Sequence, residues 1–271
     1  MLILSAVLAL LAQLQPLPPQ LVALDSDEGQ KFLLESSARR SYFALAGTFL
    51  TQKTQSFCGV ASSVMVLNAM PVQAPVSAGY APFRAFTEDN IFEAAAPMTP
   101  QFVANGGLTI EQLQSLLEAN RVEARARPAS ESSLEAFRAE ASQALAAPAH
   151  HVLIDFYRSE LGQDFGAHWS PLAAYHAGSD RFLVLDVARF RYPPYWARAA
   201  DLWKAMDTRD LDSGKTRGYV LVSPLAGAPG RVAVPLVKHR LLRLALGAGL
   251  LVFAAGVLVG ALAMRWRARR G

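Results

Sequence analysis

Residues 51–68 have the sequence TQKTQSFCGVASSVMVLN, and they hold Cys58, the only cysteine of the 271-residue chain. Small and apolar residues without proline follow the cysteine, which predicts a buried helix that begins at or near Cys58. The unpaired N–H groups and the positive dipole end of a helix N-terminus favour a thiolate over a thiol. The stretch therefore predicts a sulfur nucleophile at the start of a central helix.

Two features of the same stretch leave the role of Cys58 open. Gln52 and Gln55 precede the cysteine, and the amide of either could donate a hydrogen bond to the oxyanion that forms when a thiolate attacks a carbonyl group. Free cysteine is also among the most buried residue types, and a lone cysteine beside alanines is often a small core residue. The local sequence is consistent with both a catalytic and a structural cysteine.

The C-terminal part of the chain contains a long apolar stretch. Residues 244–264 are 21 residues without a charge, and a helix of that length, at about 1.5 Å per residue, spans the roughly 30 Å hydrocarbon core of a bilayer. We therefore expect a transmembrane helix at residues 241–264. Gly256 and Gly260 form a GxxxG motif, which would allow a homodimer through helix pairing.

The charge is distributed unevenly along the chain. Eight of the 26 Lys and Arg residues lie from Arg231 onward, where no acidic residue occurs. Residues 1–230 therefore carry 18 basic and 22 acidic residues, a net charge of −4, although the whole chain has a net charge of +4. A mildly acidic domain binds nucleic acids poorly, so we expect no nucleic-acid partner.

The two ends of the chain are typical of an exported, membrane-anchored protein. Residues 1–24 combine an apolar run with glutamines and prolines, as in a signal peptide or a short anchor. We expect the folded domain at residues 25–225, in a periplasmic or other extracytoplasmic space, and a linker at residues 226–240. A basic tail, residues 265–271, follows the expected membrane helix. Basic residues flank that helix on both sides, so the positive-inside rule leaves its orientation open.

Hydrophobic periodicity predicts helices in the first part of the domain and strands in the second. The predicted helices are residues 28–38, the helix from Cys58, residues 99–120 with a turn at Gly106–Gly107, and residues 132–147. The predicted strands are residues 151–157, 169–175, 181–187 and 219–223, with a hairpin turn at 177–180. Helices followed by an antiparallel sheet form an α+β fold.

A thiol nucleophile needs a base, and the base needs an orienting group. His168 opens one predicted strand and Asp186 ends the next, so both can reach the same edge of the sheet. A hairpin without a bulge would pair Leu172 with Leu185. Asp186 would then lie opposite Pro171, three residues from His168, and a bulge or a bent strand near Pro171 would have to close the gap. Both residue types are also common structural residues at strand ends.

The remaining histidines do not suggest a metal site. His150 and His151 are adjacent, so they would point to opposite faces of a strand, and no cysteine or carboxylate lies at ligand spacing from them. We expect neither a bound metal nor another cofactor.

Four blocks resemble the catalytic domain of the phytochelatin synthase family, whose members are papain-like cysteine transpeptidases that act on glutathione. The blocks are TQKTQSFCGVASSVMVLNAM at 51–70, GAHWSPLAAYH at 166–176, FLVLDVARFRYPPYWARAADLWKAMDTRD at 182–210 and TRGYVLVS at 216–223. The resemblance extends over residues 25–223. It implies a papain-like fold, with the Cys58 helix in the N-terminal part and the antiparallel sheet in the C-terminal part.

The resemblance also implies roles for individual residues. Cys58, His168 and Asp186 match the family's nucleophile, base and orienting residue. The family's oxyanion-hole glutamine precedes the cysteine by six positions, which selects Gln52 over Gln55.

The γ-glutamyl end of glutathione carries an amino group and a carboxylate, so its site should offer one acid and one base. The resemblance places γ-glutamyl recognition near Asp210 and Arg217, and a guanidinium suits a bidentate carboxylate contact. Arg189 and Arg158 are further candidates for substrate binding.

The implied activity is cleavage of the Cys–Gly bond of glutathione through a γ-glutamylcysteinyl thioester, with water or a second glutathione as acceptor. Plant members have a cysteine-rich region associated with metal response, which this chain does not match; short bacterial members mostly hydrolyse glutathione. Glutathione, free or as a metal thiolate, is the expected partner. The alternatives are a cysteine peptidase on another γ-glutamyl or short peptide, and a non-catalytic domain that binds a thiol peptide.

Overall fold

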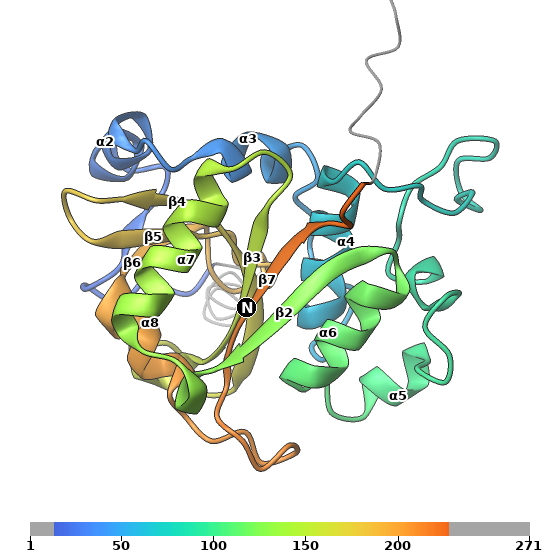
Figure 1. Ribbon diagram of the computed structural model, residues 1–271. Helices are drawn as coiled ribbons and strands as arrows, with labels where there is room; N and C mark the ends of the chain where they lie inside the picture. Colours follow the sequence, from blue (N-terminus) through green and yellow to red (C-terminus); the bar gives the residue numbers. More distant parts are fainter. Residues whose placement is uncertain (1–13, 228–271) are drawn as a thin grey trace, which may run out of the picture. The chain divides into compact units, whose positions relative to one another are not determined.

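A seven-stranded sheet forms the centre of the domain (Figure 1). The computed structural model describes residues 14–227. The strand order is β1-β6-β5-β4-β3-β7-β2, and each adjacent pair is antiparallel. The strands are β1 (Val22–Ala23), β2 (Val122–Pro128), β3 (His151–Tyr157), β4 (Ala167–His176), β5 (Arg181–Val184), β6 (Tyr195–Arg198) and β7 (Gly218–Pro224).

Helices cover both faces of this sheet (Figure 1). The α-helices are α2 (Asp27–Glu35), α3 (Arg40–Ala46), α4 (Cys58–Ala69), α5 (Pro100–Ala104), α6 (Ile110–Ala119), α7 (Leu134–Ala146) and α8 (Ala199–Met206). Three short 3₁₀ turns are η1 (Asn90–Phe92), η2 (Ala129–Glu131) and η3 (Arg158–Leu161). Helices α4 and α6 pack on one face, and α7 and α8 pack on the other.

Strand β3 shows how the sheet separates two hydrophobic cores. Successive side chains of a strand point to opposite faces. Val152, Ile154 and Phe156 belong to the core beneath α7 and α8, whereas Leu153 belongs to the core beneath α4. Asp155 therefore faces the α4 side, although it is surrounded by apolar residues in the sequence.

Helix α4 is the central helix that the sequence predicts, and it begins at Cys58. Every residue of α4 except Asn68 is buried, which explains why its sequence is apolar all around rather than on one stripe. Gly59 allows this close packing, because a Cβ atom there would lie 3.1 Å from Leu113 and 3.3 Å from both Leu108 and Trp169.

Several predicted boundaries are confirmed. β3 covers the predicted residues 151–157, and the 177–180 turn joins β4 to β5. Helix α6 begins directly after Thr109, whose hydroxyl accepts a hydrogen bond from the backbone of Gln112, while the Gln112 side chain accepts one from the backbone of Thr109. This capping box satisfies N–H groups that a helix start leaves without partners.

The predicted fold class is wrong because it added a membrane-spanning helix to the α/β domain. Within residues 14–227, every helix is too short or too polar to cross a bilayer. The stretch predicted to span the membrane, residues 241–264, lies outside the described residues, as do the basic tail and residues 228–240 of the linker.

The predicted order of helices first and strands afterwards is also wrong. β2 precedes α7, and α8 lies between β6 and β7. β2 has the sequence VEARARP, in which alanines rather than large apolar residues alternate with charged ones, so its strand signal is weak. Residues 22–23, inside the segment predicted to precede the domain, pair with β6 as the edge strand β1.

Candidate active site

Cys58 lies at the first residue of α4, where this helix meets β4. The backbone amides of Trp169 and Gly59 favour the thiolate form of its sulfur. Trp169 also accepts a hydrogen bond at its carbonyl from Ser62 Oγ, at 3.3 Å, so the first two turns of α4 are fixed to β4. Trp169 directly follows His168, which brings the predicted nucleophile and the predicted base to the same part of the sheet.

Burial dominates the ionisation of Cys58. Removal from water raises the pKa of the thiol to about 11, although the two backbone N–H groups act in the opposite direction. The helix N-terminus is present as predicted, but the expected preference for a thiolate is not. Burial therefore favours the thiol form of Cys58 over the thiolate.

His168 and Asp186 form a hydrogen bond, with 2.9 Å between Nε2 and Oδ1. The register of the β4–β5 hairpin shifts by one residue after Leu172, which pairs with Val184 rather than with Leu185. The shift moves Asp186 one position closer to His168. An irregularity of the kind that the spacing required near this point is therefore confirmed.

Arg158 holds Asp186 from the other side. Its guanidinium donates two hydrogen bonds of 2.9 Å, one to each carboxylate oxygen, and a third of 2.7 Å to Gln163. The Arg158 side chain is 2% exposed. The resemblance made Arg158 a candidate for substrate binding, but the structure places it behind Asp186.

The charges of this group shift two pKa values. Burial lowers the pKa of His168 to about 4, assisted by the positive charge of Arg158 and opposed by Asp186. Burial raises the pKa of Asp186, but the attraction of His168 and Arg158 outweighs it and holds the pKa well below its usual range. At neutral pH Asp186 is therefore ionised and His168 is neutral.

Gln52 lies beside this group, because its backbone N–H donates to the carbonyl of Val187 at 3.0 Å. Its side-chain amide donates to the carbonyls of Thr54, at 2.7 Å, and Gln55, at 3.0 Å. Its Oε1 is buried and lacks a hydrogen-bond partner among residues 14–227. Gln52 must exchange one of its two donated bonds before it can donate to an oxyanion.

A second charged group contains Asp155, Asp210 and Arg217. Arg217 Nε lies 3.5 Å from Asp155, and its Nη2 lies 3.6 Å from Asp210. Nη1 donates to the carbonyl of Arg209 at 2.6 Å, and the guanidinium lies over the Tyr157 ring, 5.3 Å from its centre. The structure therefore brings Asp210 and Arg217 together, as the resemblance implied.

Asp155 was missed by the sequence interpretation. The available signal was a single acidic residue inside the otherwise apolar strand HVLIDFY. Burial raises the pKa of Asp155 well above its usual value; Arg217 lowers it and Asp210 raises it further. Asp155 is paired in register with Trp169 of β4, whose ring packs against the start of α4.

Arg189, the remaining candidate, is exposed, and its guanidinium lies 4.6 Å from the centre of the Phe49 ring. The structure gives it no contact with Arg217 or Asp210 among the described residues.

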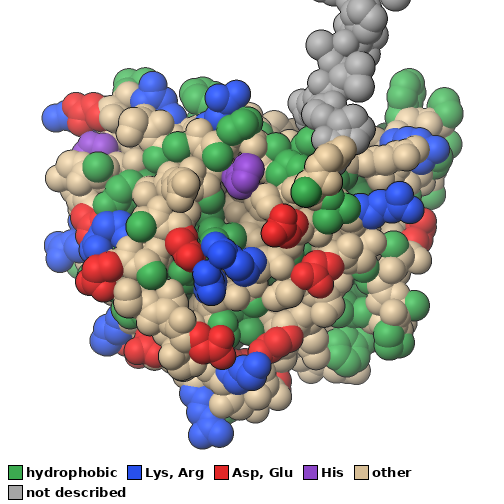
Figure 2. Space-filling view, viewed as in Figure 1, with side chains coloured by type: hydrophobic (Ala, Val, Ile, Leu, Met, Phe, Trp, Pro, Cys, Tyr) green, Lys and Arg blue, Asp and Glu red, His purple; other side chains and the backbone are tan. Residues whose placement is uncertain are grey.

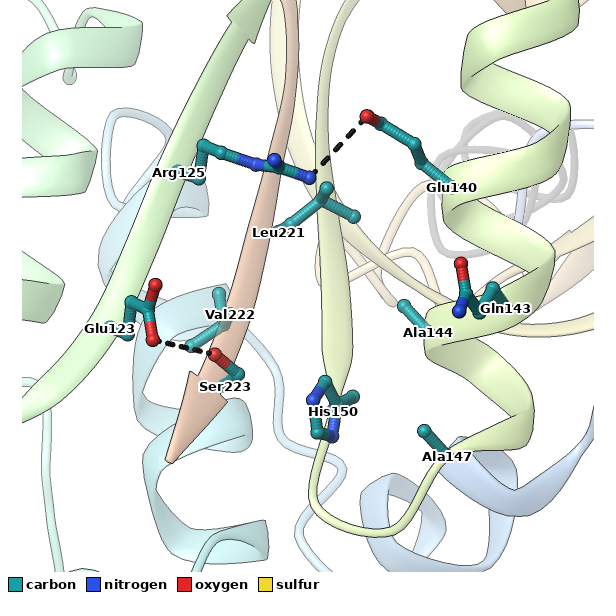
Figure 3. Close-up of a pocket in the computed structure, with 10 residues that line it drawn as sticks. All are labelled: Glu123, Arg125, Glu140, Gln143, Ala144, Ala147, His150, Leu221, Val222 and Ser223. Atoms are coloured by element: carbon teal, nitrogen blue, oxygen red, sulfur yellow. Dashed lines mark hydrogen bonds and ion pairs between the residues drawn. The ribbon is translucent and has the colours of Figure 1, made fainter. Parts of the chain in front are cut away.

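A pocket of about 360 Å³ lies elsewhere, between α7 and the strands β2 and β7 (Figure 3). Arg125 of β2 and Glu140 of α7 face each other across it, 3.3 Å apart. Acidic and basic side chains are interspersed on this face of the molecule (Figure 2). None of the predicted site residues lines this pocket, and α7 covers the face of the sheet opposite to α4.

Comparison with known proteins gives one consistent result. The sequence profile of the family described as phytochelatin synthase matches residues 12–219. Glutathione gamma-glutamylcysteinyltransferase 1 of Lotus japonicus is 34% identical over 86% of this chain and 46% of its own length. The enzyme of that name from Triticum aestivum is 33% identical over 82% of this chain and 44% of its own. Glutathione gamma-glutamylcysteinyltransferase of Schizosaccharomyces pombe is 29% identical over 82% and 54%. The chain spans about half the length of these relatives.

Proposed function

Since this chain belongs to the phytochelatin synthase family, we propose that it is an enzyme that transfers the γ-glutamylcysteinyl group of glutathione through a thioester on Cys58. The observation that carries the proposal is the hydrogen-bonded pair of His168 and Asp186, fixed by Arg158, beside Trp169, the next residue of β4, which packs against the first turn of α4 where Cys58 lies. This arrangement supplies a nucleophile, a base and a group that orients the base.

The first half of the reaction forms the thioester. Nε2–H of neutral His168 donates to Asp186, which leaves Nδ1 as the base that accepts the Cys58 proton. The sulfur attacks the carbonyl carbon of the Cys–Gly bond, and the backbone N–H of Cys58, with Gln52 once it has exchanged a bond, stabilises the oxyanion. His168 then protonates the glycine nitrogen as the C–N bond breaks. Glycine leaves, and the γ-glutamylcysteinyl group remains on Cys58.

The second half of the reaction frees the enzyme. Water, deprotonated by His168, releases γ-glutamylcysteine and restores the thiol. The amino group of a second glutathione can take the acyl group instead, which gives a phytochelatin of two units. In both cases the proton removed from the acceptor returns to the Cys58 sulfur through His168.

The charged group at Asp210 and Arg217 supports γ-glutamyl recognition. Arg217 would bind the α-carboxylate of the substrate, and Asp210 would bind its ammonium group. Arg217 is 6% exposed and Asp210 is 14% exposed, so these contacts would form in a largely desolvated place where they are stronger than in water.

The test is to incubate the full chain with glutathione in ¹⁸O-labelled water and identify the products by mass. Hydrolysis gives glycine and γ-glutamylcysteine labelled in its new carboxylate, whereas transfer gives unlabelled peptides larger than glutathione. Cys58→Ser should give neither product. Absence of product from the wild type, or equal product from Cys58→Ser, would contradict the proposal.

A further inference from the structure

Asp155 lies in the middle of a row of polar groups that crosses the sheet. β3 lies between β4 and β7, and Asp155 is paired in register with Trp169 of β4 and with Gly218 of β7. The Trp169 ring packs against the first turn of α4, 3.3 Å from the Cβ position of Gly59, which directly follows Cys58, and Arg217 directly precedes Gly218. Asp155 is therefore placed between the nucleophile and the guanidinium.

The length of this row matches the length of the acyl group in the proposed function. Neighbouring strands are about 4.8 Å apart, so β4 and β7 are separated by about 10 Å. In a γ-glutamylcysteinyl group, six bonds separate the attacked carbonyl carbon from the glutamyl α-carbon, which is about 7 to 8 Å at bond lengths near 1.5 Å. When the substrate's α-carboxylate lies at Arg217 and its attacked carbonyl carbon lies at Cys58, the amide that joins its glutamyl and cysteinyl residues lies over β3.

The Asp155 carboxyl group and Nε of Arg217 have hydrogen-bonding capacity that the described part of the chain leaves unused. The Asp155 side chain is 5% exposed, and its nearest charged neighbour, Arg217 Nε, is 3.5 Å away, longer than a good hydrogen bond. Arg217 Nε is itself buried without an acceptor in the described part of the chain. Buried polar groups without partners require an explanation, and a ligand supplies one.

Asp210 differs from Asp155 in this respect. Its carboxylate accepts hydrogen bonds from backbone N–H groups of its own loop, at 3.1 Å from Ser213 and 3.4 Å from Asp212. Burial favours the neutral form of Asp155 by raising its pKa. A neutral carboxyl group has one donor and one acceptor side by side, which is also the pattern of an amide.

We propose that Asp155 is a specificity residue that hydrogen-bonds the amide group joining the γ-glutamyl and cysteinyl residues of the substrate. The proposal rests on the proposed function and adds a contact to the middle of the acyl group. Asp155 thereby sets the distance between the γ-glutamyl head group and the bond to be cleaved. A structural alternative is that Asp155 serves only as a counter-ion for Arg217.

Two substitutions separate these roles. Asp155→Asn removes the charge but keeps one donor and one acceptor, so kcat/KM for glutathione should stay within about fivefold of the wild type. Asp155→Leu has a similar shape without hydrogen bonds and should lower kcat/KM by about 10- to 100-fold, mainly through KM. If Asp155 is only a counter-ion, Asp155→Asn should be impaired as strongly as Asp155→Leu.

A substrate analogue tests the contact itself. The analogue replaces the γ-glutamyl amide by an ester, which removes the N–H donor and leaves the rest of glutathione unchanged. The wild type and Asp155→Asn should each prefer glutathione over this ester by about tenfold, and Asp155→Leu should lose most of that preference. As a control, 4-aminobutyryl-cysteinylglycine keeps the amide but lacks the α-carboxylate, so all three proteins should discriminate against it equally.

The outcomes distinguish this proposal from the proposed function. A wild type that does not cleave glutathione contradicts the proposed function. If the wild type cleaves glutathione but Asp155→Leu keeps the wild-type preference for glutathione over the ester, only the role of Asp155 is overturned. If Asp155→Leu does not fold, the kcat/KM of Asp155→Asn still decides, because the two roles predict opposite results for it.

Discussion

Arg158 is a positioning residue in the proposed mechanism, because it contacts Asp186 and no reacting atom. Its fork binds both carboxylate oxygens at 2.9 Å inside the protein, and it keeps Asp186 in the plane that His168 needs. An ammonium group cannot reproduce this two-point contact. The orientation of the base therefore depends on a residue outside the reacting group.

We predict that Arg158→Lys lowers kcat by about 100-fold with little change in KM, because a misplaced base costs rate rather than binding. Steady-state kinetics with glutathione measure this. Arg138 provides the matched control: it binds Asp180 with two bonds of 2.8 Å, but on the surface. Arg138→Lys should leave kcat unchanged and stability within about 1 kcal/mol. An unchanged kcat in Arg158→Lys would remove the positioning role.

The sequence predicted the residues of the site better than their environments. The helix that begins at Cys58 followed from the sequence pattern, whereas spacing only permitted the contact between His168 and Asp186, which the resemblance selected. The pKa of Cys58, which burial raises to about 11, could not be predicted from the sequence, because it depends on how much protein covers the sulfur. Tertiary packing places Arg158 behind Asp186 and Asp155 beside Arg217. A local sequence pattern does not predict such packing.

At the scale of elements, the contact between α4 and β4 sets the geometry of the site. Gly59 lies at its closest point, with three side chains within 3.3 Å of the place a Cβ atom would take. The same contact carries the hydrogen bond from Ser62 Oγ to the Trp169 carbonyl, one turn after Cys58. A small change in this packing therefore moves the nucleophile relative to the base.

We predict that Gly59→Ala destabilises the protein and lowers kcat. Alanine improves helix propensity by about 1 kcal/mol, but overpacking a closed core costs about 1 to 3 kcal/mol, and with three neighbours affected at once the second effect should prevail. Urea unfolding and steady-state kinetics measure the two results. Gly79 has no atom within 4 Å of its Cβ position, so Gly79→Ala should change neither. Gly59→Ala with wild-type stability would show that α4 can shift freely.

The elements that the sequence failed to predict share a physical cause. β6 is four residues long and β1 only two, so neither is long enough for an alternating pattern to be recognised in the sequence. β2 alternates alanine with glutamate and arginine, and alanine is a weak strand signal on its own. All three strands are held by pairing with distant segments, β1 and β6 with each other and β2 with β7. Local sequence does not contain that information.

At the scale of the whole domain, the sheet separates two hydrophobic cores. Cys58 belongs to the core beneath α4. Phe137 of α7 and Tyr219 of β7 belong to the core on the opposite face. The titratable groups that are buried in the first core or beside it make the stability of the entire domain sensitive to pH.

His151 is such a group, and it lies apart from the site. Its Nδ1 is 2.5 Å from Ser41 Oγ, and its Nε2 is buried without a hydrogen-bond partner within residues 14–227. Burial, together with the nearby His150, lowers the pKa of His151 from 6.5 to about 4. The pKa of His168 is lowered in the same way.

We predict that the domain loses stability as the pH falls from about 6.5 to about 4. In this range the unfolded chain binds a proton at each of these histidines and the folded chain does not, so each histidine lowers the unfolding free energy by about 1.4 kcal/mol per pH unit. Asp155 acts in the opposite direction, because its raised pKa lets the folded state bind a proton first. The test is therefore a difference: urea unfolding from pH 7.5 to 4.5 should show a shallower loss in His151→Asn than in the wild type. Parallel curves would mean that His151 is protonated in the folded state, and that water or a rearranged Ser41 reaches its Nε2.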